Sequence, residues 1–239
     1  MSEVGTNRID QRFAKLRKEG GKALIPFITA GDPDLETTEE LLLAMAESGA
    51  DIIEIGIPFS DPTAEGPTIQ RSSKRALDAG TSLRSILQLV ARVRDRIEQP
   101  LVLMGYANPI HAMGAEAYAT TAAQVGVDGI IIPDLTPEDG AEYLNPSRAA
   151  GIHPILLAAP TTRPARLEML VKETRGFLYY VSLQGVTGAR SDLAAGIEDK
   201  VQAAQALGDI HVWVGFGVGT PEQAEQIRRY GACLGGGSA

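Results

Sequence analysis

Short apolar runs alternate with amphipathic segments along nearly the whole chain, and this alternation is the feature that most restricts the fold. Each run ends in Gly, Pro, Asp or Asn, as strands do where they give way to loops. The pattern predicts eight strands: Leu24–Ala30, Asp51–Pro58, Leu101–Ala107, Gly129–Asp134, Pro154–Ala159, Phe177–Ser182, His211–Gly217 and Ala232–Gly236.

Amphipathic helical patterns fill the intervals between these runs. In the first of them, Asp32 or Asp34 can cap the start of the helix and Gly49 can end it. No Gly/Ser-rich linker divides the chain. We therefore expect one (β/α)8 barrel of the α/β class, with an open doubly wound sheet as the structural alternative. The helical patterns cover residues 34–49, 82–97, 114–126, 163–176, 192–208 and 220–231.

Composition and charge disfavour several classes of protein. The 239 residues are 44% hydrophobic, which supplies a sizeable core. A formal net charge of −8 disfavours binding to nucleic acid or to an anionic membrane. The N-terminus lacks the apolar stretch of a secretory signal, no run approaches the ~20 apolar residues of a membrane span, and the single cysteine, Cys233, rules out an intramolecular disulfide. We therefore expect a cytoplasmic protein.

One acid interrupts the second predicted strand. Period-two alternation places Ile53, Ile55 and Ile57 on one face and Glu54 on the other. Because barrel strands turn their aliphatic face toward the helices, we expect Glu54 to point into the barrel. Burial there raises the pKa of a carboxyl group toward the range useful for proton transfer at neutral pH. The alternative is a structural glutamate that a neighbouring hydroxyl satisfies.

The loop after this strand offers a second acid. Glu65 is placed to reach over the same site when the loop closes, and Asp61 competes for that role. In the alternative interpretation, Asp61 caps a turn and Glu65 is solvated.

Two adjacent tyrosines lie in the sixth predicted strand. Alternation sends one of Tyr179 and Tyr180 into the barrel and the other toward the helices, and composition does not distinguish them. A buried tyrosine hydroxyl needs a hydrogen-bond partner, and Glu54 is a suitable one.

Glycine clusters follow the last three predicted strands, at residues 185–188, 215–217 and 235–238. Backbone N–H groups approach an anion closely at glycines, and barrel phosphate sites are commonly built from the last βα loops. The clusters therefore predict a phosphate site at one edge of the barrel. Each cluster alone is equally compatible with an ordinary turn.

Metal and dinucleotide sites find no support in the motifs. His111, His153 and His211 are isolated and show no metal-ligand spacing. The GFGVGT stretch lacks the next glycine and the distal acid of a dinucleotide fingerprint. We expect no metal site and no cofactor in this chain.

Strand-loop motifs follow one another through nearly the whole chain: IPFITAGDPD, IEIGIPFSDP, GPTIQ, MGYANPI, PDLTPED, VSLQGVTGAR and GFGVGTPEQ. In their order and spacing they resemble the α subunit family of tryptophan synthase. The resemblance implies a barrel lyase that splits indole-3-glycerol phosphate into indole and glyceraldehyde 3-phosphate. It also implies a tryptophan synthase β subunit as partner, which carries pyridoxal phosphate and receives the indole.

The resemblance assigns roles to particular positions. Glu54 matches the catalytic glutamate of the family and Tyr179 its active-site tyrosine. Glu65 stands where the family normally has a catalytic aspartate, and Thr63 replaces a common leucine. The other matches are Phe27, Tyr106 and Phe216 near the indole ring, and Gly188, Gly217, Gly237 and Ser238 around the phosphate.

The implied retro-aldol reaction explains the need for two acids. Indole C3 must gain a proton, the adjacent glycerol hydroxyl must lose one, and the positive indolenine must be stabilised through its ring N–H. Glu54 is expected to exchange the protons, while Glu65 accepts a hydrogen bond from the ring.

The chain stops at Ala239, directly after the eighth predicted strand, where family members continue with a phosphate-facing helix and a covering helix. We therefore expect residues 1–239 to form one barrel domain, truncated after strand eight and without the final C-terminal helix.

Two other functions stay open: a catalytically weak homologue that acts as an allosteric partner of a β subunit, and another phosphosugar enzyme on the same barrel.

Overall fold

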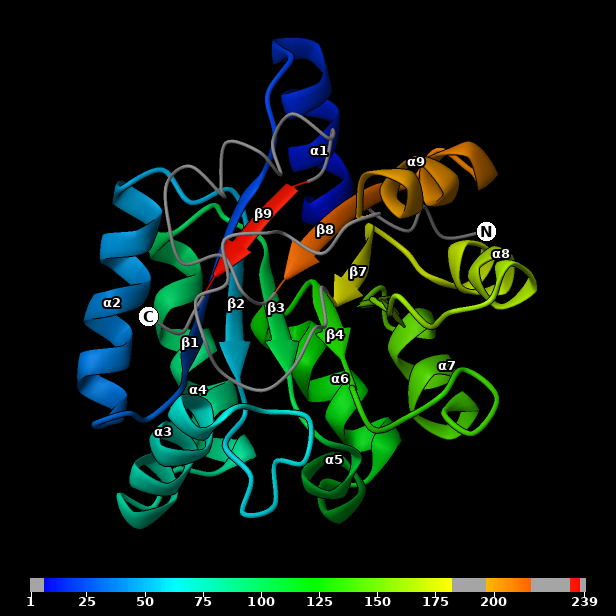
Figure 1. Ribbon diagram of the computed structural model, residues 1–239. Coiled ribbons are helices and arrows are strands. Elements are labelled where there is room, and N and C mark those ends of the chain that lie inside the picture. The colour runs from blue at the N-terminus through cyan, green and yellow to red at the C-terminus, as the bar shows by residue number, and fades with distance from the viewer. Residues whose placement is uncertain (1–6, 182–196, 216–232, 237–239) are drawn as a thin grey trace.

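The computed structural model describes residues 7–181, 197–215 and 233–236. Within these ranges all the strands are parallel and form one sheet, in the order β5-β4-β3-β2-β1-β9-β8-β7-β6 (Figure 1). The strands are β1 Leu24–Thr29, β2 Ile53–Gly56, β3 Leu101–Met104, β4 Gly129–Ile131, β5 His153–Pro154, β6 Leu157–Ala158, β7 Phe177–Val181, β8 His211–Gly215 and β9 Cys233–Gly236.

Each predicted strand has a counterpart, and the fifth is divided into β5 and β6 because the backbone changes partners in its middle. The amide of Ile155 donates to the carbonyl of Ile130 in β4, whereas the carbonyl of Leu156 accepts from the amide of Tyr179 in β7. One short segment thus joins the two ends of the sheet and closes it. The prediction of a barrel is confirmed, and the open sheet is wrong.

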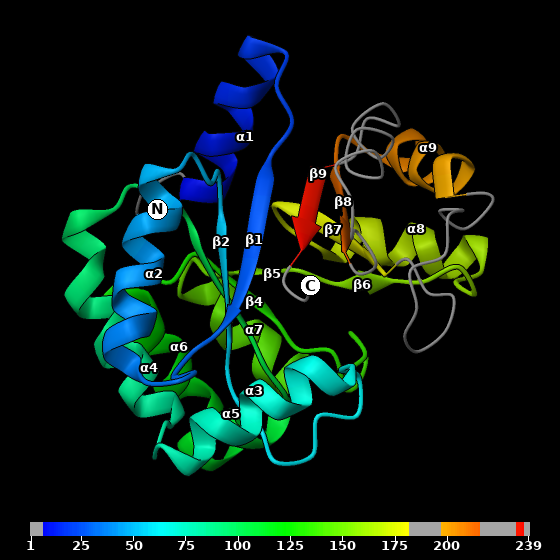
Figure 2. The ribbon, with the colours of Figure 1, turned by 60° about the vertical axis from the view of Figure 1, so that its left-hand side comes forward.

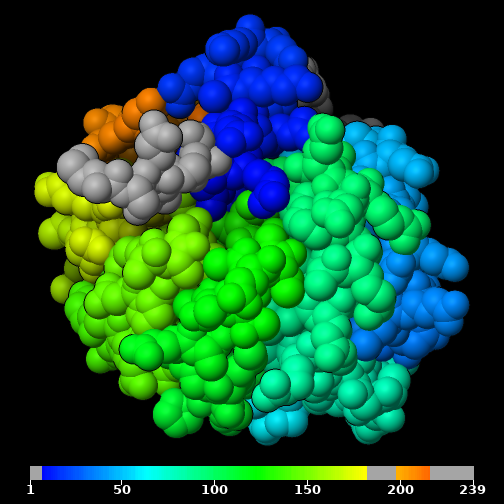
Figure 3. All heavy atoms as spheres, turned by 180° about the vertical axis from the view of Figure 1, so that it is seen from behind, coloured from blue at the N-terminus to red at the C-terminus, as the bar shows by residue number. Residues whose placement is uncertain are grey.

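Helices cover the outside of the sheet (Figure 1). Seen from behind as spheres, successive parts of the chain follow one another around the molecule, from blue through cyan and green to yellow (Figure 3). Five of the predicted helices are confirmed; the pattern at residues 220–231 lies outside the described residues. Four further helices, α1, α3, α5 and α7, were not predicted. Within the described ranges, no helix combines the length and apolar character needed to cross a membrane. The helices are α1 Arg8–Glu19, α2 Leu35–Glu47, α3 Pro67–Asp78, α4 Leu83–Val93, α5 Ala107–Met113, α6 Ala115–Val125, α7 Ala141–Ala149, α8 Pro164–Glu173 and α9 Ile197–Leu207, and a 3-10 turn, Arg94–Arg96, follows α4.

Alternation along the strands separates two apolar clusters. The outer cluster lies between strands and helices and includes Ile53, Ile55 and Ile57, as predicted. The inner cluster fills the barrel with residues such as Ile52 and Trp213. It also contains one face of α1, so this helix closes the amino-terminal end of the barrel.

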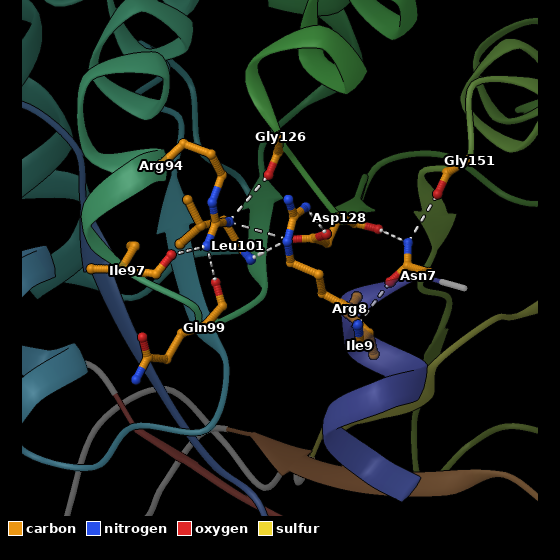
Figure 4. A network of polar contacts seen from close by, with 10 residues as sticks. All are labelled: Asn7, Arg8, Ile9, Arg94, Ile97, Gln99, Leu101, Gly126, Asp128 and Gly151. Carbon is orange, nitrogen blue, oxygen red and sulfur yellow. Dashed lines mark hydrogen bonds and ion pairs between the residues drawn. The ribbon is translucent and has the colours of Figure 1, made fainter. Parts of the chain in front are cut away.

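A buried carboxylate ties α1 to that end (Figure 4). Asp128, which is 3% exposed, accepts hydrogen bonds from Arg8 Nη1 at 3.0 Å and from the Leu101 amide at 2.9 Å. Arg94 Nη1 lies 3.5 Å from Asp128 Oδ2, the oxygen that also accepts from the Leu101 amide, and Asn7 Nδ2 donates to the Asp128 carbonyl at 2.9 Å. These contacts fix the start of α1 at the amino-terminal end of the barrel.

Candidate active site

The loops that follow β2, β3 and β4 lie together at the end of the barrel opposite α1 (Figures 1 and 2). This is the end to which the strands point, and enzymes with this architecture place their chemistry there. Glu54, Glu65 and Tyr106 lie in β2 or the loops after β2 and β3. The sequence motifs predicted polar chemistry at this end.

Glu54 points into the barrel, as predicted. It lies in register with Phe27 of β1 and Val102 of β3, and it is 1% exposed. Neither carboxyl oxygen has a hydrogen-bond partner among the described residues. Burial, and then the charge of Glu65, raise the pKa of Glu54 well above its ordinary value. The shift favours the protonated form of Glu54, which can donate a proton.

Glu65 is half-buried in the loop that follows β2. Its amide donates to the Pro62 carbonyl at 3.1 Å, and its carbonyl accepts from Gln70 Nε2 at 2.9 Å. The half-buried side chain does not fit the interpretation of a solvated Glu65, and burial raises the pKa of Glu65 to about 7. Asp61 is exposed, and its carboxylate accepts a hydrogen bond from Ser60 Oγ at 2.5 Å. Of the two loop acids, Glu65 is therefore the one that is partly buried and whose charge acts on Glu54.

The structure resolves the choice between the tyrosines: Tyr179 belongs to the inner cluster and Tyr180 to the outer one. Burial and the nearby glutamates raise the pKa of Tyr179 well above its ordinary value, so it stays neutral. The expected hydrogen bond from Tyr179 to Glu54 is not formed. The hydroxyl instead lies against β8, where a Cβ on Gly215 would come within 2.5 Å of it.

Aromatic rings line the wall next to the two glutamates. Phe27 packs on Gly56, where an added Cβ would lie 2.6 Å from the ring, so a larger residue would displace it. Phe59 stacks on Tyr106 with ring centroids 5.2 Å apart. These rings and Glu65 border a cavity of about 10 Å³. Phe59 was not predicted as a site residue, although its place three residues after β2, in the PFSDP motif, was a signal.

The remaining predicted site residues are not described by the structure. Phe216, expected near the indole ring, and the phosphate-site residues Gly188, Gly217, Gly237 and Ser238 lie outside the described residues. The phosphate site therefore stays a prediction.

Each histidine has an aromatic or acidic neighbour. His111 Nδ1 lies 2.9 Å from the Tyr143 hydroxyl, and His153 Nε2 lies 2.8 Å from Asp10. His211 stacks on Phe13 at a centroid distance of 4.1 Å. Among the described side chains, no group of three or more His, Cys, Asp or Glu is placed to hold a metal ion.

Comparison with known proteins agrees with this geometry. The family model for the tryptophan synthase alpha chain matches residues 13–239. The chain is 49% identical over 221 residues to the tryptophan synthase alpha chain of Geobacter sp. strain M21, covering 92% of this chain and 83% of that protein. The corresponding protein of Geobacter sulfurreducens is 51% identical, with 92% and 84% covered.

Solved structures give the same result. Tryptophan synthase of Mycobacterium tuberculosis superposes with a TM-score of 0.90 at 38% identity, over 98% of this chain and 90% of that one. Tryptophan synthase subunit alpha of Legionella pneumophila str. Paris gives a TM-score of 0.88 at 37% identity, over 98% and 87%. On sequence and fold together, the chain belongs to the tryptophan synthase alpha chain family.

Proposed function

We propose that this chain is the α subunit of tryptophan synthase, a carbon–carbon lyase that cleaves indole-3-glycerol phosphate to indole and glyceraldehyde 3-phosphate. The observation that carries the proposal is Glu54, a fully buried carboxyl group without a hydrogen-bond partner among the described residues, at the loop end of a barrel. A group in this environment holds its proton at neutral pH and releases it to a suitably placed base. In the reaction of this family, the group that receives the proton is C3 of the indole ring.

Glu54 carries the proton in both directions. Its protonated carboxyl group donates to indole C3, which gives the positive indolenine. The carboxylate that remains accepts the proton of the adjacent glycerol hydroxyl as the carbon–carbon bond breaks. The bonding electrons return to the indole ring, the hydroxyl oxygen becomes the aldehyde carbonyl, and Glu54 regains its proton.

Glu65 stabilises the charge that forms on the ring. With a pKa of about 7, its carboxyl group is substantially ionised at neutral pH. The carboxylate accepts a hydrogen bond from the indole N–H and stabilises the indolenine. Phe27 and Tyr106 form the aromatic wall against which the ring lies.

Family membership supports the remaining assignments. We propose that Phe216 contacts the indole ring and that Gly188, Gly217, Gly237 and Ser238 bind the phosphate. Residues 1–239 form one barrel domain that acts in the cytoplasm. Indole passes to a tryptophan synthase β subunit, and pyridoxal phosphate belongs to that partner, with no cofactor in this chain.

The test is indole release from indole-3-glycerol phosphate, measured with and without a β subunit. We expect turnover by the parent protein and a kcat about 1,000-fold lower in Glu54→Gln, because an amide cannot exchange the proton. Circular dichroism would establish that the variant is folded. No indole from the parent protein, even with a β subunit, would refute the proposal.

A further inference from the structure

The loop that carries Glu65 joins β2 to α3 and spans residues 57–66. Inside the loop, the Thr63 amide donates to the Asp61 carbonyl at 2.9 Å and the Glu65 amide to the Pro62 carbonyl at 3.1 Å. These bonds shape the loop but do not place it over the barrel. A contact with a neighbouring loop is needed for that.

Tyr106 provides such a contact. Its hydroxyl accepts a hydrogen bond from the Ala64 amide at 2.8 Å. The distance is that of a well-formed hydrogen bond between a backbone amide and an oxygen. Ala64 directly precedes Glu65, and consecutive Cα atoms are about 3.8 Å apart. Fixing this amide therefore fixes the origin of the Glu65 side chain.

Tyr106 is itself held in place. The side chain is 4% exposed, and its ring stacks on Phe59. The residue caps the start of α5, and the next amide, that of Ala107, donates to Asp134 Oδ1 at 3.0 Å. The hydroxyl is thus a fixed point on the loop that follows β3, supported in turn from the loop that follows β4.

We propose that Tyr106 is a positioning residue for Glu65, whose hydroxyl holds the Ala64 amide and thereby keeps the Glu65 carboxyl group over the end of the barrel that contains Glu54. The inference rests on the proposed lyase function and adds a second role to a residue assigned only to the indole pocket. The hydroxyl holds the loop, and the ring contacts the substrate.

The protonation state of Tyr106 is compatible with this role. The pKa of Tyr106 is raised to about 12, first by burial and then by the charges of Glu65 and Asp134, against hydrogen bonds from Ala64 and Thr63 that lower it. The hydroxyl is therefore neutral across the working pH range. The effect of the Glu65 charge also shows that the two side chains are electrostatic neighbours.

Tyr106→Phe removes the acceptor and keeps the ring, and Tyr143→Phe is a matched control. Tyr143 also uses its hydroxyl, toward His111 at 2.9 Å, but it lies on α7 outside the site. Hydrogen–deuterium exchange followed by mass spectrometry would compare the segment 59–66 in the two variants. We expect exchange several-fold faster than in the parent in Tyr106→Phe and unchanged in Tyr143→Phe, since the Ala64 amide loses its partner only in the first.

A double-mutant cycle with Glu65→Gln tests whether the hydroxyl acts through Glu65. We expect Tyr106→Phe to lower kcat about 10-fold in the parent, with KM nearly unchanged, and less than about 2-fold when Glu65 is already replaced. An equal loss in both backgrounds, no loss in either, or unchanged exchange would overturn the proposal. If the parent protein lacks lyase activity, the proposed function fails, while the exchange comparison still decides whether Tyr106 holds the loop.

Discussion

The two ends of the barrel each contain a buried carboxyl group, and the groups differ in their partners. Asp128, 3% exposed, receives hydrogen bonds from two arginines and a backbone amide at the amino-terminal end. Glu54, 1% exposed, has no hydrogen-bond partner among the described residues. Burial alone therefore does not determine what an acid does in this protein.

Hydrogen-bond partners distinguish a structural acid from a reactive one. Donors around Asp128 satisfy its charge, so the group can link α1, the turn after α4 and β3. Without such donors, burial favours the neutral form of Glu54, and its pKa rises. The first arrangement stabilises the fold, and the second stores a proton for chemistry.

The largest effect on stability is expected at the amino-terminal end. Asp128→Asn should lower the free energy of unfolding by about 3–5 kcal/mol, because Arg94 is left buried without its counter-ion. Glu54→Gln should change it by less than about 1 kcal/mol, since no hydrogen bond among the described residues is lost. Urea denaturation of both variants measures the contrast. Equal losses would show that Glu54 is a structural acid too.

Shortening the loop acid should have a smaller effect. Glu65→Asp withdraws the carboxyl group by one methylene from the position that the closed loop gives it. We expect kcat to fall about 10-fold, since displacements of about 1 Å reduce rates by up to ~100-fold. Steady-state kinetics of indole release measure the change. A large gain in kcat would instead show that the native loop is impaired and would favour the catalytically weak homologue.

The smallest expected effect is on the pH dependence of stability. The pKa of Glu65 is about 7 in the folded protein and about 4.3 in an unfolded chain. Between these values the folded state keeps a proton that the unfolded state has lost, so stability falls as pH rises. One such group contributes at most about 1.4 kcal/mol per pH unit, and the half-buried Glu65 contributes less.

The free energy of unfolding of the parent and of Glu65→Gln would be measured by urea denaturation at several pH values from 4.5 to 7. We expect the free energy of unfolding to fall less steeply in the variant, because the remaining decline comes from other groups such as Glu54. Parallel curves for the two proteins would mean that Glu65 titrates normally and is solvated.

Periodic patterns in the sequence predicted the barrel and the orientation of Glu54. Glu54 was predictable because isoleucines flank it at period two, and the strand has one aliphatic face. Tyr179 was not, because a tyrosine occupies each face of that strand. The helix α7 was missed because Pro146 lies inside it, and α1 was missed although Ile9, Phe13 and Leu16 have helical spacing.

Contacts between distant segments were beyond prediction. Asp128 meets Arg8 across 120 positions, and the Tyr106 hydroxyl meets the Ala64 amide across 42. Neither pair leaves a periodic pattern, since each depends on how loops close around the finished barrel. The half-buried state of Glu65 has the same origin, because it depends on where the loop after β2 lies.

The proposed mechanism requires Glu54 to keep its proton at neutral pH. Carbon-13 NMR of protein labelled at the glutamate carboxyl carbons would follow each group through a pH titration, and the spectrum of Glu54→Gln would assign the resonance. We predict that the Glu54 signal stays at its protonated position at pH 7. Titration near the ordinary glutamate value of about 4.3 would contradict the account.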